Sequence, residues 1–181
     1  MTPADARQIL ADAELLVSEA EVEQAIEDLA RAITSRLKDA DPLVLTVMGG
    51  AVIFAGQLLP RLAFPLSVDY LHATRYGDAT RGGELTWLAE PRTTVADRVV
   101  LVLDDILDEG VTLAAIKARL FALGARECLV AVLTEKQLAH AKPIQADFVG
   151  LRLPDRYVFG CGMDIKGAWR NLPAIYALRG R

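Results

Sequence analysis

Cysteine is scarce in this sequence, and clusters of basic side chains are missing. The chain has 181 residues and two cysteines, Cys128 and Cys161, whose spacing does not suit a metal site. Cys128 lies in the apolar stretch ECLVAVLT, where we expect a small buried side chain rather than a reactive thiol. The net charge is -4 and no run of Lys or Arg occurs, which argues against nucleic acid as the main partner.

Long apolar segments are also lacking. The longest apolar-rich run, Leu43 to Gly56, has 14 residues and is interrupted by Thr46 and a pair of glycines. It is shorter than the roughly 20 residues that span a bilayer. The first residues do not show a basic segment followed by an apolar one, so no secretory signal is predicted. We therefore expect a cytoplasmic protein with no membrane partner.

The sequence does contain enough apolar side chains, 52%, for a substantial core. Strand-like runs alternate with helical patterns, which predicts an α/β fold with a mainly parallel central sheet flanked by helices. We expect one domain over residues 1–181, with a core at about 40–152 and a small cap from about 1–39 and 153–181. Helices are predicted after Thr2 and Pro3 and after the capping pair Ser18 and Glu21, and the tail from Pro154 is predicted to be irregular.

The most informative stretch is VVLVLDDILDEGVTL, from Val99 to Leu113. Five apolar residues predict a buried parallel strand, and the apolar spacing after Leu113 predicts a helix that ends near Gly124. The pattern is strand, acidic loop, helix, and in parallel sheets ligands bind where strands end and helices begin. A helix N-terminus favours phosphate, and carboxylates accept hydrogen bonds from sugar hydroxyls. The stretch therefore predicts a ribose 5-phosphate site.

Two other interpretations of this stretch are an acidic loop without a ligand and the acid cluster of a receiver domain. A receiver domain would carry its acid pair on the first strand, whereas here the pair comes past mid-chain.

The motif resembles the signature of the type I phosphoribosyltransferases, an acid pair followed by D-x-G-x-T. Four further segments narrow the resemblance to the hypoxanthine-guanine phosphoribosyltransferases over about residues 43–172: VMGGAVIF, VDYLHATRYG, LTEK and PDRYVFGCGMDIKGAWRNL. The resemblance implies transfer of ribose 5-phosphate from phosphoribosyl pyrophosphate to a 6-oxopurine, with Mg2+ as cofactor and pyrophosphate as leaving group. It also implies the fold of that family and a homodimer or homotetramer.

The resemblance assigns roles to the acidic stretch. Asp104 and Asp105 would accept hydrogen bonds from the ribose hydroxyls. Together with Asp164 they would bind Mg2+. Asp108 would be the catalytic carboxylate beside purine N7. The 5-phosphate would be held by Glu109, Gly110, Val111 and Thr112. Thr112 could also be a helix N-cap, and Asp108 could be only a turn residue.

The resemblance also assigns the other substrate contacts. Pyrophosphate would meet Arg170 and the backbone of Gly49 and Gly50, where the family often has a cis peptide that would fall at Met48–Gly49. Lys136 would donate to purine O6, because an ammonium only donates and so prefers a carbonyl to an amine. The base would contact Tyr157 by stacking and Val158 by its backbone, and a flap would carry Arg75 and Tyr76.

Each of these residues has a plainer interpretation. Lys136 could be an exposed loop lysine, Tyr157 a core aromatic and Arg170 half of a surface ion pair. The glycine pair could be a simple turn.

Two residues depart from the family pattern. Gly49 stands where many members have Lys or Arg, which removes a cation near pyrophosphate. Glu109 replaces a small hydroxyl residue, and we expect its side chain to turn away from the phosphate because like charges repel. The sequence leaves open a xanthine-preferring enzyme and a nucleotide-sensing RNA-binding regulator on the same fold.

Overall fold

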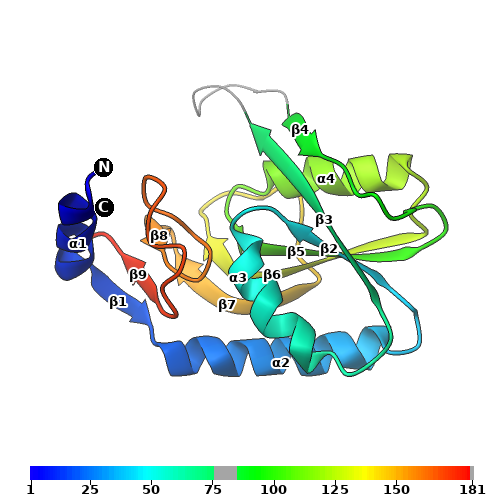
Figure 1. The fold of residues 1–181 in the computed structure, drawn as a ribbon, viewed down its shortest axis with the longest axis horizontal. Helices are drawn as coiled ribbons and strands as arrows, with labels where there is room; N and C mark the ends of the chain where they lie inside the picture. The colour runs from blue at the N-terminus through cyan, green and yellow to red at the C-terminus, as the bar shows by residue number, and fades with distance from the viewer. Residues whose placement is uncertain (76–84, 180–181) are drawn as a thin grey trace.

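Two sheets organise the part of the chain that the computed structural model describes, residues 1–75 and 85–179 (Figure 1). The larger sheet has six strands in the order β4-β3-β2-β5-β6-β7, and every neighbouring pair is parallel except β3 and β4. Its strands are β2 (Leu43–Val47), β3 (Ser67–Arg75), β4 (Leu85–Ala89), β5 (Val99–Leu107), β6 (Glu127–Gln137) and β7 (Phe148–Pro154). The expected mainly parallel sheet is therefore confirmed.

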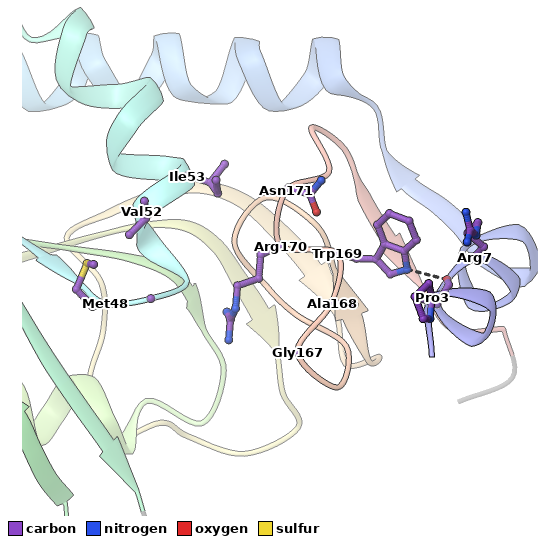
Figure 2. Close-up of a pocket in the computed structure, with 12 residues that line it drawn as sticks. Pro3, Arg7, Met48, Val52, Ile53, Gly167, Ala168, Trp169, Arg170 and Asn171 are labelled. Atoms are coloured by element: carbon purple, nitrogen blue, oxygen red, sulfur yellow. Dashed lines mark hydrogen bonds between the residues drawn. The ribbon is translucent and has the colours of Figure 1, made fainter. Parts of the chain in front are cut away.

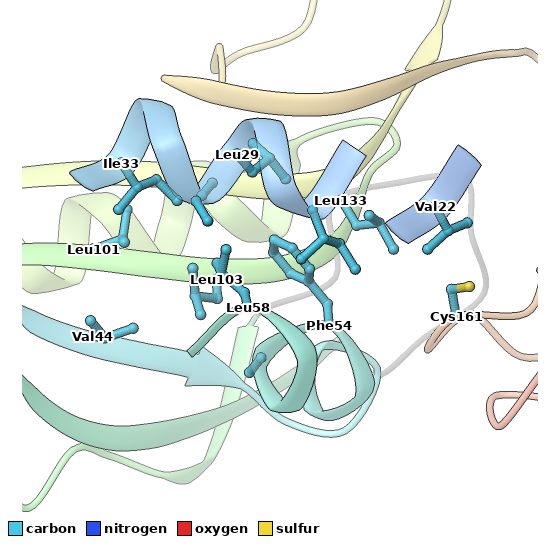
Figure 3. Packing of buried hydrophobic residues seen from close by; sticks show 14 of the residues in the cluster. Val22, Leu29, Ile33, Val44, Phe54, Leu58, Leu101, Leu103, Leu133 and Cys161 are labelled. Atoms are coloured by element: carbon cyan, nitrogen blue, oxygen red, sulfur yellow. The ribbon is translucent and has the colours of Figure 1, made fainter. Parts of the chain in front are cut away.

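Helices cover both faces of this sheet. Helices α2 (Glu19–Leu37) and α3 (Ala51–Leu58) pack on one face, and a short 3-10 turn, Leu59–Arg61, follows α3. Helix α4 (Val111–Ala122) packs on the other face. Because β5 is covered on both sides, its apolar run is unbroken. Leu101 and Leu103 face α2 and α3, as Figure 3 shows, while Val100 and Val102 face α4.

A second, three-stranded antiparallel sheet lies beside the first and has the order β1-β9-β8 (Figure 1). It is made of β1 (Glu14–Val17), β8 (Val158–Phe159) and β9 (Ile175–Ala177). We call this sheet, helix α1 (Pro3–Asp12) and the rest of residues 154–179 the hood. None of the described helices is both long and apolar enough to cross a membrane.

The hood differs from the sequence-based prediction in two ways. The predicted cap at 1–39 included α2, but α2 buries Ile26, Leu29 and Ile33 in the cluster that covers one face of the main sheet and so belongs to the core. The tail predicted to be irregular contains β8 and β9. These strands are too short for an alternating pattern. They form because β9 pairs with both β8 and β1, while Phe159 and Tyr176 stack at 5.7 Å.

Strand β5 is longer than its apolar run, and this corrects the predicted acidic loop. The strand continues through Asp104 and Asp105 to Leu107, because its pairing with β6 continues to Leu107 opposite Glu135. Only residues 108–110 form the loop. Strand β6 likewise extends to Gln137, so both acids and the lysine at 136 are held by the rigid sheet.

Candidate active site

The short loop after β5 ends on a glycine that the local geometry requires. Gly110 has φ +79° and is the N-cap of α4, so the alternative that Thr112 caps this helix is wrong. A Cβ at Gly110 would lie 3.0 Å from Ile144 Cγ2. The N–H groups of the first turn of α4 have no partners within the helix, which makes this end suited to an anion. The loop pocket, about 300 Å³, is lined by residues 104–106 and 108–113.

Glu109 lies at the exposed edge of this loop. Its Oε2 is 2.9 Å from Nε2 of His140, in the connection between β6 and β7. The carboxylate is thus engaged by a neighbouring side chain, the arrangement expected if it avoids a phosphate at the start of α4.

The acid pair lies deeper in the site. Asp105 is only 7% exposed, and its backbone N–H donates to Asp104 Oδ1 at 3.1 Å. Burial, together with the neighbouring Asp105 carboxylate, raises the pKa of Asp104 well above its ordinary range. Burial also raises the pKa of Asp105, and the positive charge of Arg170 opposes that rise. Ionised carboxylates here are stabilised once hydrogen-bond donors or a cation reach them.

Three segments meet at Asp105 with no room for side chains. A Cβ at Gly50 would lie 2.1 Å from Asp105 Oδ2, and a Cβ at Gly162, in the hood, would lie 2.3 Å from the Gly50 carbonyl oxygen. Gly162 also has φ +106°. In contrast, a Cβ at Gly49 would meet nothing within 4 Å. The Met48–Gly49 peptide is cis, as the family resemblance implies.

A second pocket, of about 310 Å³, lies where β5, β6 and the hood come together. We call it the lysine pocket, and it is lined by Asp105, Ile106, Asp108, Lys136, Tyr157, Val158, Met163, Asp164 and Arg170. Lys136 Nζ donates to Asp108 Oδ2 at 2.9 Å, and the lysine side chain is only 12% exposed. The alternative of an exposed loop lysine is therefore wrong, since Lys136 lies on β6 and points into the pocket.

The hood supplies the other charged groups of this pocket. Arg170 Nη2 lies 2.5 Å from Asp164 Oδ1, and Arg170 Nη1 donates to the Gly162 carbonyl at 2.6 Å. The Gly167 N–H donates to Asp164 Oδ2 at 2.7 Å. These contacts hold the acid and the arginine side by side at the pocket. Arg170 therefore lines the pocket in addition to forming an ion pair.

Tyr157 also faces the lysine pocket and is not a core aromatic, because it is 47% exposed. Its hydroxyl donates to the Asp164 carbonyl at 3.2 Å. Partial burial and the nearby Asp164 carboxylate raise the pKa of this hydroxyl, which keeps it a donor. Val158 follows on β8, opposite Ala177 of β9.

A third and larger pocket, about 730 Å³, lies between α1, the start of α3 and residues 167–171 of the hood, which we call the hood loop, as Figure 2 shows. We call it the hood pocket. Met48, Gly49 and Val52 line one side, and Trp169 and Arg170 line the other. Trp169 Nε1 donates to the Ala6 carbonyl at 2.7 Å and so ties the hood loop to α1 (Figure 2).

The acids fit a magnesium ion only if a ligand contributes oxygens too. In residues 1–75 and 85–179, no three His, Cys, Asp or Glu side chains lie close enough together to hold a metal ion. Mg2+ commonly uses one or two carboxylates together with substrate phosphates and water. Asp164 in one pocket and Asp104 and Asp105 in the adjoining one suit that mode.

Sequence reasoning missed several residues of the site. Thr134 is fully buried, and its hydroxyl donates to the Asp105 carbonyl at 2.9 Å. The available signal was a polar residue directly after the apolar run CLVAVL of β6. Gly162 and Met163 left no such signal, because their contacts join segments far apart in the sequence.

The predicted flap lies mostly beyond what the structure describes. Tyr76 is outside the described residues. Arg75 ends β3, where its backbone pairs with Leu85.

The chain is also similar to known proteins over most of its length. The family model of the phosphoribosyl transferase domain matches residues 14–166. The hypoxanthine-guanine phosphoribosyltransferase of Bacillus subtilis (strain 168) is 32% identical over 166 residues, which cover 91% of this chain and 92% of that protein. The hypoxanthine-guanine-xanthine phosphoribosyltransferase of Tritrichomonas foetus is 31% identical over 166 residues, 91% of each. A crystal structure of a hypoxanthine phosphoribosyltransferase from Staphylococcus aureus has a TM-score of 0.89 at 26% identity, covering 95% of each chain.

Proposed function

This chain belongs to the phosphoribosyltransferase family, and from that premise we propose that it is a purine-salvage enzyme. It transfers ribose 5-phosphate from phosphoribosyl pyrophosphate to hypoxanthine and guanine, giving IMP and GMP and releasing pyrophosphate. The observation that carries the proposal is the pair of Lys136 and Asp108 at 2.9 Å in the lysine pocket.

This pair is complementary to one edge of a 6-oxopurine. The base presents an acceptor at O6 next to N7, which carries a proton in one tautomer. Lys136 can donate to O6 while Asp108 accepts the N7 proton, so the two charges that pair in the free protein each take a partner on the base. An adenine amino group would instead place a donor against the Lys136 ammonium. The pocket therefore favours 6-oxopurines, and proton transfer to Asp108 assists attack by N9 on the ribose C1.

The acid pair and the loop pocket hold the ribose 5-phosphate in this proposal. Asp104 and Asp105 accept hydrogen bonds from the two ribose hydroxyls. The N–H groups from Glu109 to Thr112 face the 5-phosphate at the positive end of the α4 dipole, and the Thr112 hydroxyl adds a donor. Fixing the sugar at both ends sets its C1 against the base.

The remaining contacts serve the leaving group and the face of the base. Arg170 and the backbone of Gly49 and Gly50 meet pyrophosphate, for which a planar guanidinium is well shaped. Asp164, with Asp104 and Asp105, would hold Mg2+, which when bound neutralises charge on the leaving pyrophosphate. Tyr157 stacks on the base, and the backbone of Val158 borders it. The family resemblance also assigns Arg75 and Tyr76 to a flap, and Tyr76 lies outside the described residues.

Two further parts of the proposal rest on the family resemblance. The enzyme works as a homodimer or homotetramer, and it is located in the cytoplasm. Sedimentation of the purified chain would test the first, since a monomer at working concentration would contradict it.

The decisive experiment measures nucleotide formation from phosphoribosyl pyrophosphate and Mg2+ with hypoxanthine, guanine, xanthine and adenine in parallel. We expect conversion of the 6-oxopurines hypoxanthine and guanine. In Asp108→Asn the loss should be about 10²- to 10⁴-fold in kcat, the usual range for a general acid–base group. Asp39→Asn, at an exposed site after α2, is the control and should match the wild type.

The outcomes separate the competing functions. Preference for xanthine would redefine the substrate but not the reaction. A folded chain that makes no nucleotide from any base but binds RNA at physiological salt would contradict the enzyme and support the regulator.

A further inference from the structure

The connection between β6 and β7 carries a largely buried lysine that lines neither the loop pocket nor the lysine pocket. Lys142 has a side chain that is only 9% exposed. Its Nζ donates to two backbone carbonyls, that of Leu107 at 3.0 Å and that of Lys136 at 2.5 Å. One ammonium thus ties together two strands, β5 and β6, that are far apart in the sequence.

The two carbonyls occupy particular places in the site. The Leu107 carbonyl belongs to the peptide that leads into Asp108. The other carbonyl belongs to Lys136 itself. Lys142 therefore bonds the backbone on either side of the 2.9 Å pair formed by the Asp108 and Lys136 side chains.

The need for such a bond follows from where the sheet ends. The ladder between β5 and β6 stops at Leu107 opposite Glu135. Past that point the main-chain hydrogen bonds that set the strand separation are no longer present, yet the two reactive side chains emerge there. A donor that bonds both chain ends can hold their spacing, and small displacements of reacting groups are known to reduce rates strongly.

The surroundings of Lys142 are built to keep it in place. Glu135 Oε1 lies 3.5 Å from its Nζ and balances the charge, while Arg152 Nε lies 3.6 Å from the other oxygen of Glu135. The connection that carries Lys142 also packs on the loop at residues 108–110, since a Cβ at Gly110 would lie 3.0 Å from Ile144 Cγ2 and 3.6 Å from Lys142 Cβ.

Lys142 does not reach the lysine pocket. It lines another pocket, of about 400 Å³, together with Glu135, His140 and Arg152, and this pocket shares Lys136 with the lysine pocket. Any effect on the base must therefore pass through the backbone that it holds.

We propose that Lys142 is a positioning residue for the purine site, which sets the separation of Asp108 and Lys136 by bonding the carbonyls of Leu107 and Lys136. This inference rests on the proposed function, because it concerns the same reaction.

The test compares steady-state kinetics of the wild type, Lys142→Met and Lys142→Gln. Methionine keeps the length and apolar stem but removes every donor, whereas glutamine keeps two N–H donors. We expect kcat/KM for hypoxanthine to fall at least tenfold in Lys142→Met, with KM for phosphoribosyl pyrophosphate changed less than threefold. Lys142→Gln should lie between this variant and the wild type. Lys38→Met, at the exposed end of α2, is the matched control.

Thermal unfolding of each variant separates positioning from stability alone. If Lys142 were merely structural, Lys142→Met would unfold earlier while its folded fraction kept the wild-type KM and kcat, and that result would overturn the proposal. If Lys142→Met does not fold, Lys142→Gln decides. Its kcat/KM for hypoxanthine should fall while its KM for phosphoribosyl pyrophosphate changes little. A wild type that makes no nucleotide from any base would refute the proposed function and the positioning role together, whereas an active wild type matched by the variants would refute only the latter.

Discussion

At Asp104 and Asp105, two adjacent carboxyl groups are held in the protein before any sugar or cation reaches them. Their pKa values are raised, first of all by burial. As pH rises, the unfolded chain therefore releases these protons before the folded chain does. Over that interval the folded state binds more protons, so the free energy of unfolding falls as pH increases.

Replacing one of these acids should therefore stabilise the ligand-free protein. We expect Asp104→Asn to unfold at a higher temperature than the wild type at pH 7, because the amide has no proton to lose. The difference should shrink as pH falls through and below the ordinary carboxyl pKa of 3.8, because both states of the wild type then become protonated. Thermal unfolding across this pH range measures the effect, and a difference independent of pH would contradict the explanation. Activity should fall because a ribose contact is lost.

The two adjacent glycines at the end of β2 offer a matched pair of substitutions. Gly50→Ala would place a Cβ 2.1 Å from Asp105 Oδ2, so the carboxylate must move. We expect at least a tenfold loss of kcat/KM for phosphoribosyl pyrophosphate and destabilisation by about 1–3 kcal/mol, as for other overpacked sites. Gly49→Ala meets nothing within 4 Å and should keep both properties. Equal effects of the two substitutions would show that the contact with Asp105 does not matter.

At this scale the sequence predicted residues with a local signature better than residues that act across segments. Asp108 and Lys136 stand in short motifs, and the structure brings them together. Gly162 lies against Gly50, and Lys142 bonds the Leu107 carbonyl. Both partners are more than 30 positions away, and no local pattern marks such contacts.

Among the elements, the strands that carry the site show where local propensity is overridden. The pattern of an apolar run followed by acids predicts a loop at the two adjacent aspartates, a residue type that is depleted in strands. The structure extends β5 through them because β6 offers a continuous hydrogen-bonding partner. The central strands and α2 were predictable from long apolar patterns and a capping box, whereas β8 and β9 depend on pairing between distant segments.

Helix α1 depends on few contacts for its place in the hood. It contains no buried residue, although Thr2 and Asp5 form a capping box at its start. The bond from Trp169 Nε1 to the Ala6 carbonyl joins it to the hood loop. We expect Trp169→Phe, which removes this donor, to weaken the attachment by about 1 kcal/mol.

Amide hydrogen exchange would detect this change. Exchange in residues 3–12 should become faster in Trp169→Phe, while exchange in β5 stays unchanged. Trp87→Phe, on the edge strand β4, serves as the control and should leave α1 unaffected. Unchanged exchange in α1 after loss of the Trp169 donor would mean that other contacts hold the helix.

Considered as a whole molecule, the protein places its site where the main sheet meets the hood, and the two also share one buried hydrophobic cluster. The proposed nucleotide contacts come from the end of β5, from β6 and from the hood. A bound nucleotide should therefore stabilise the sheet and the hood together.

We expect IMP at 100 times its Kd to add about 2.7 kcal/mol to the free energy of unfolding. For a chain of this size, each kcal/mol raises Tm by about 2–4 °C. Thermal unfolding with increasing IMP would measure the shift, with AMP as the control, since its amino group opposes Lys136 and should shift Tm less. An equal shift with AMP would contradict selection of the 6-oxo group by that lysine.

Trp169, which bonds the Ala6 carbonyl, can also report on the hood through its fluorescence. The sequence contains two tryptophans, so Trp87→Phe leaves a single indole, which lines the hood pocket beside Arg170. Indole emission responds to the polarity and charge around the ring. The fluorescence of that variant would therefore follow the hood and its neighbouring arginine in real time, without any attached dye.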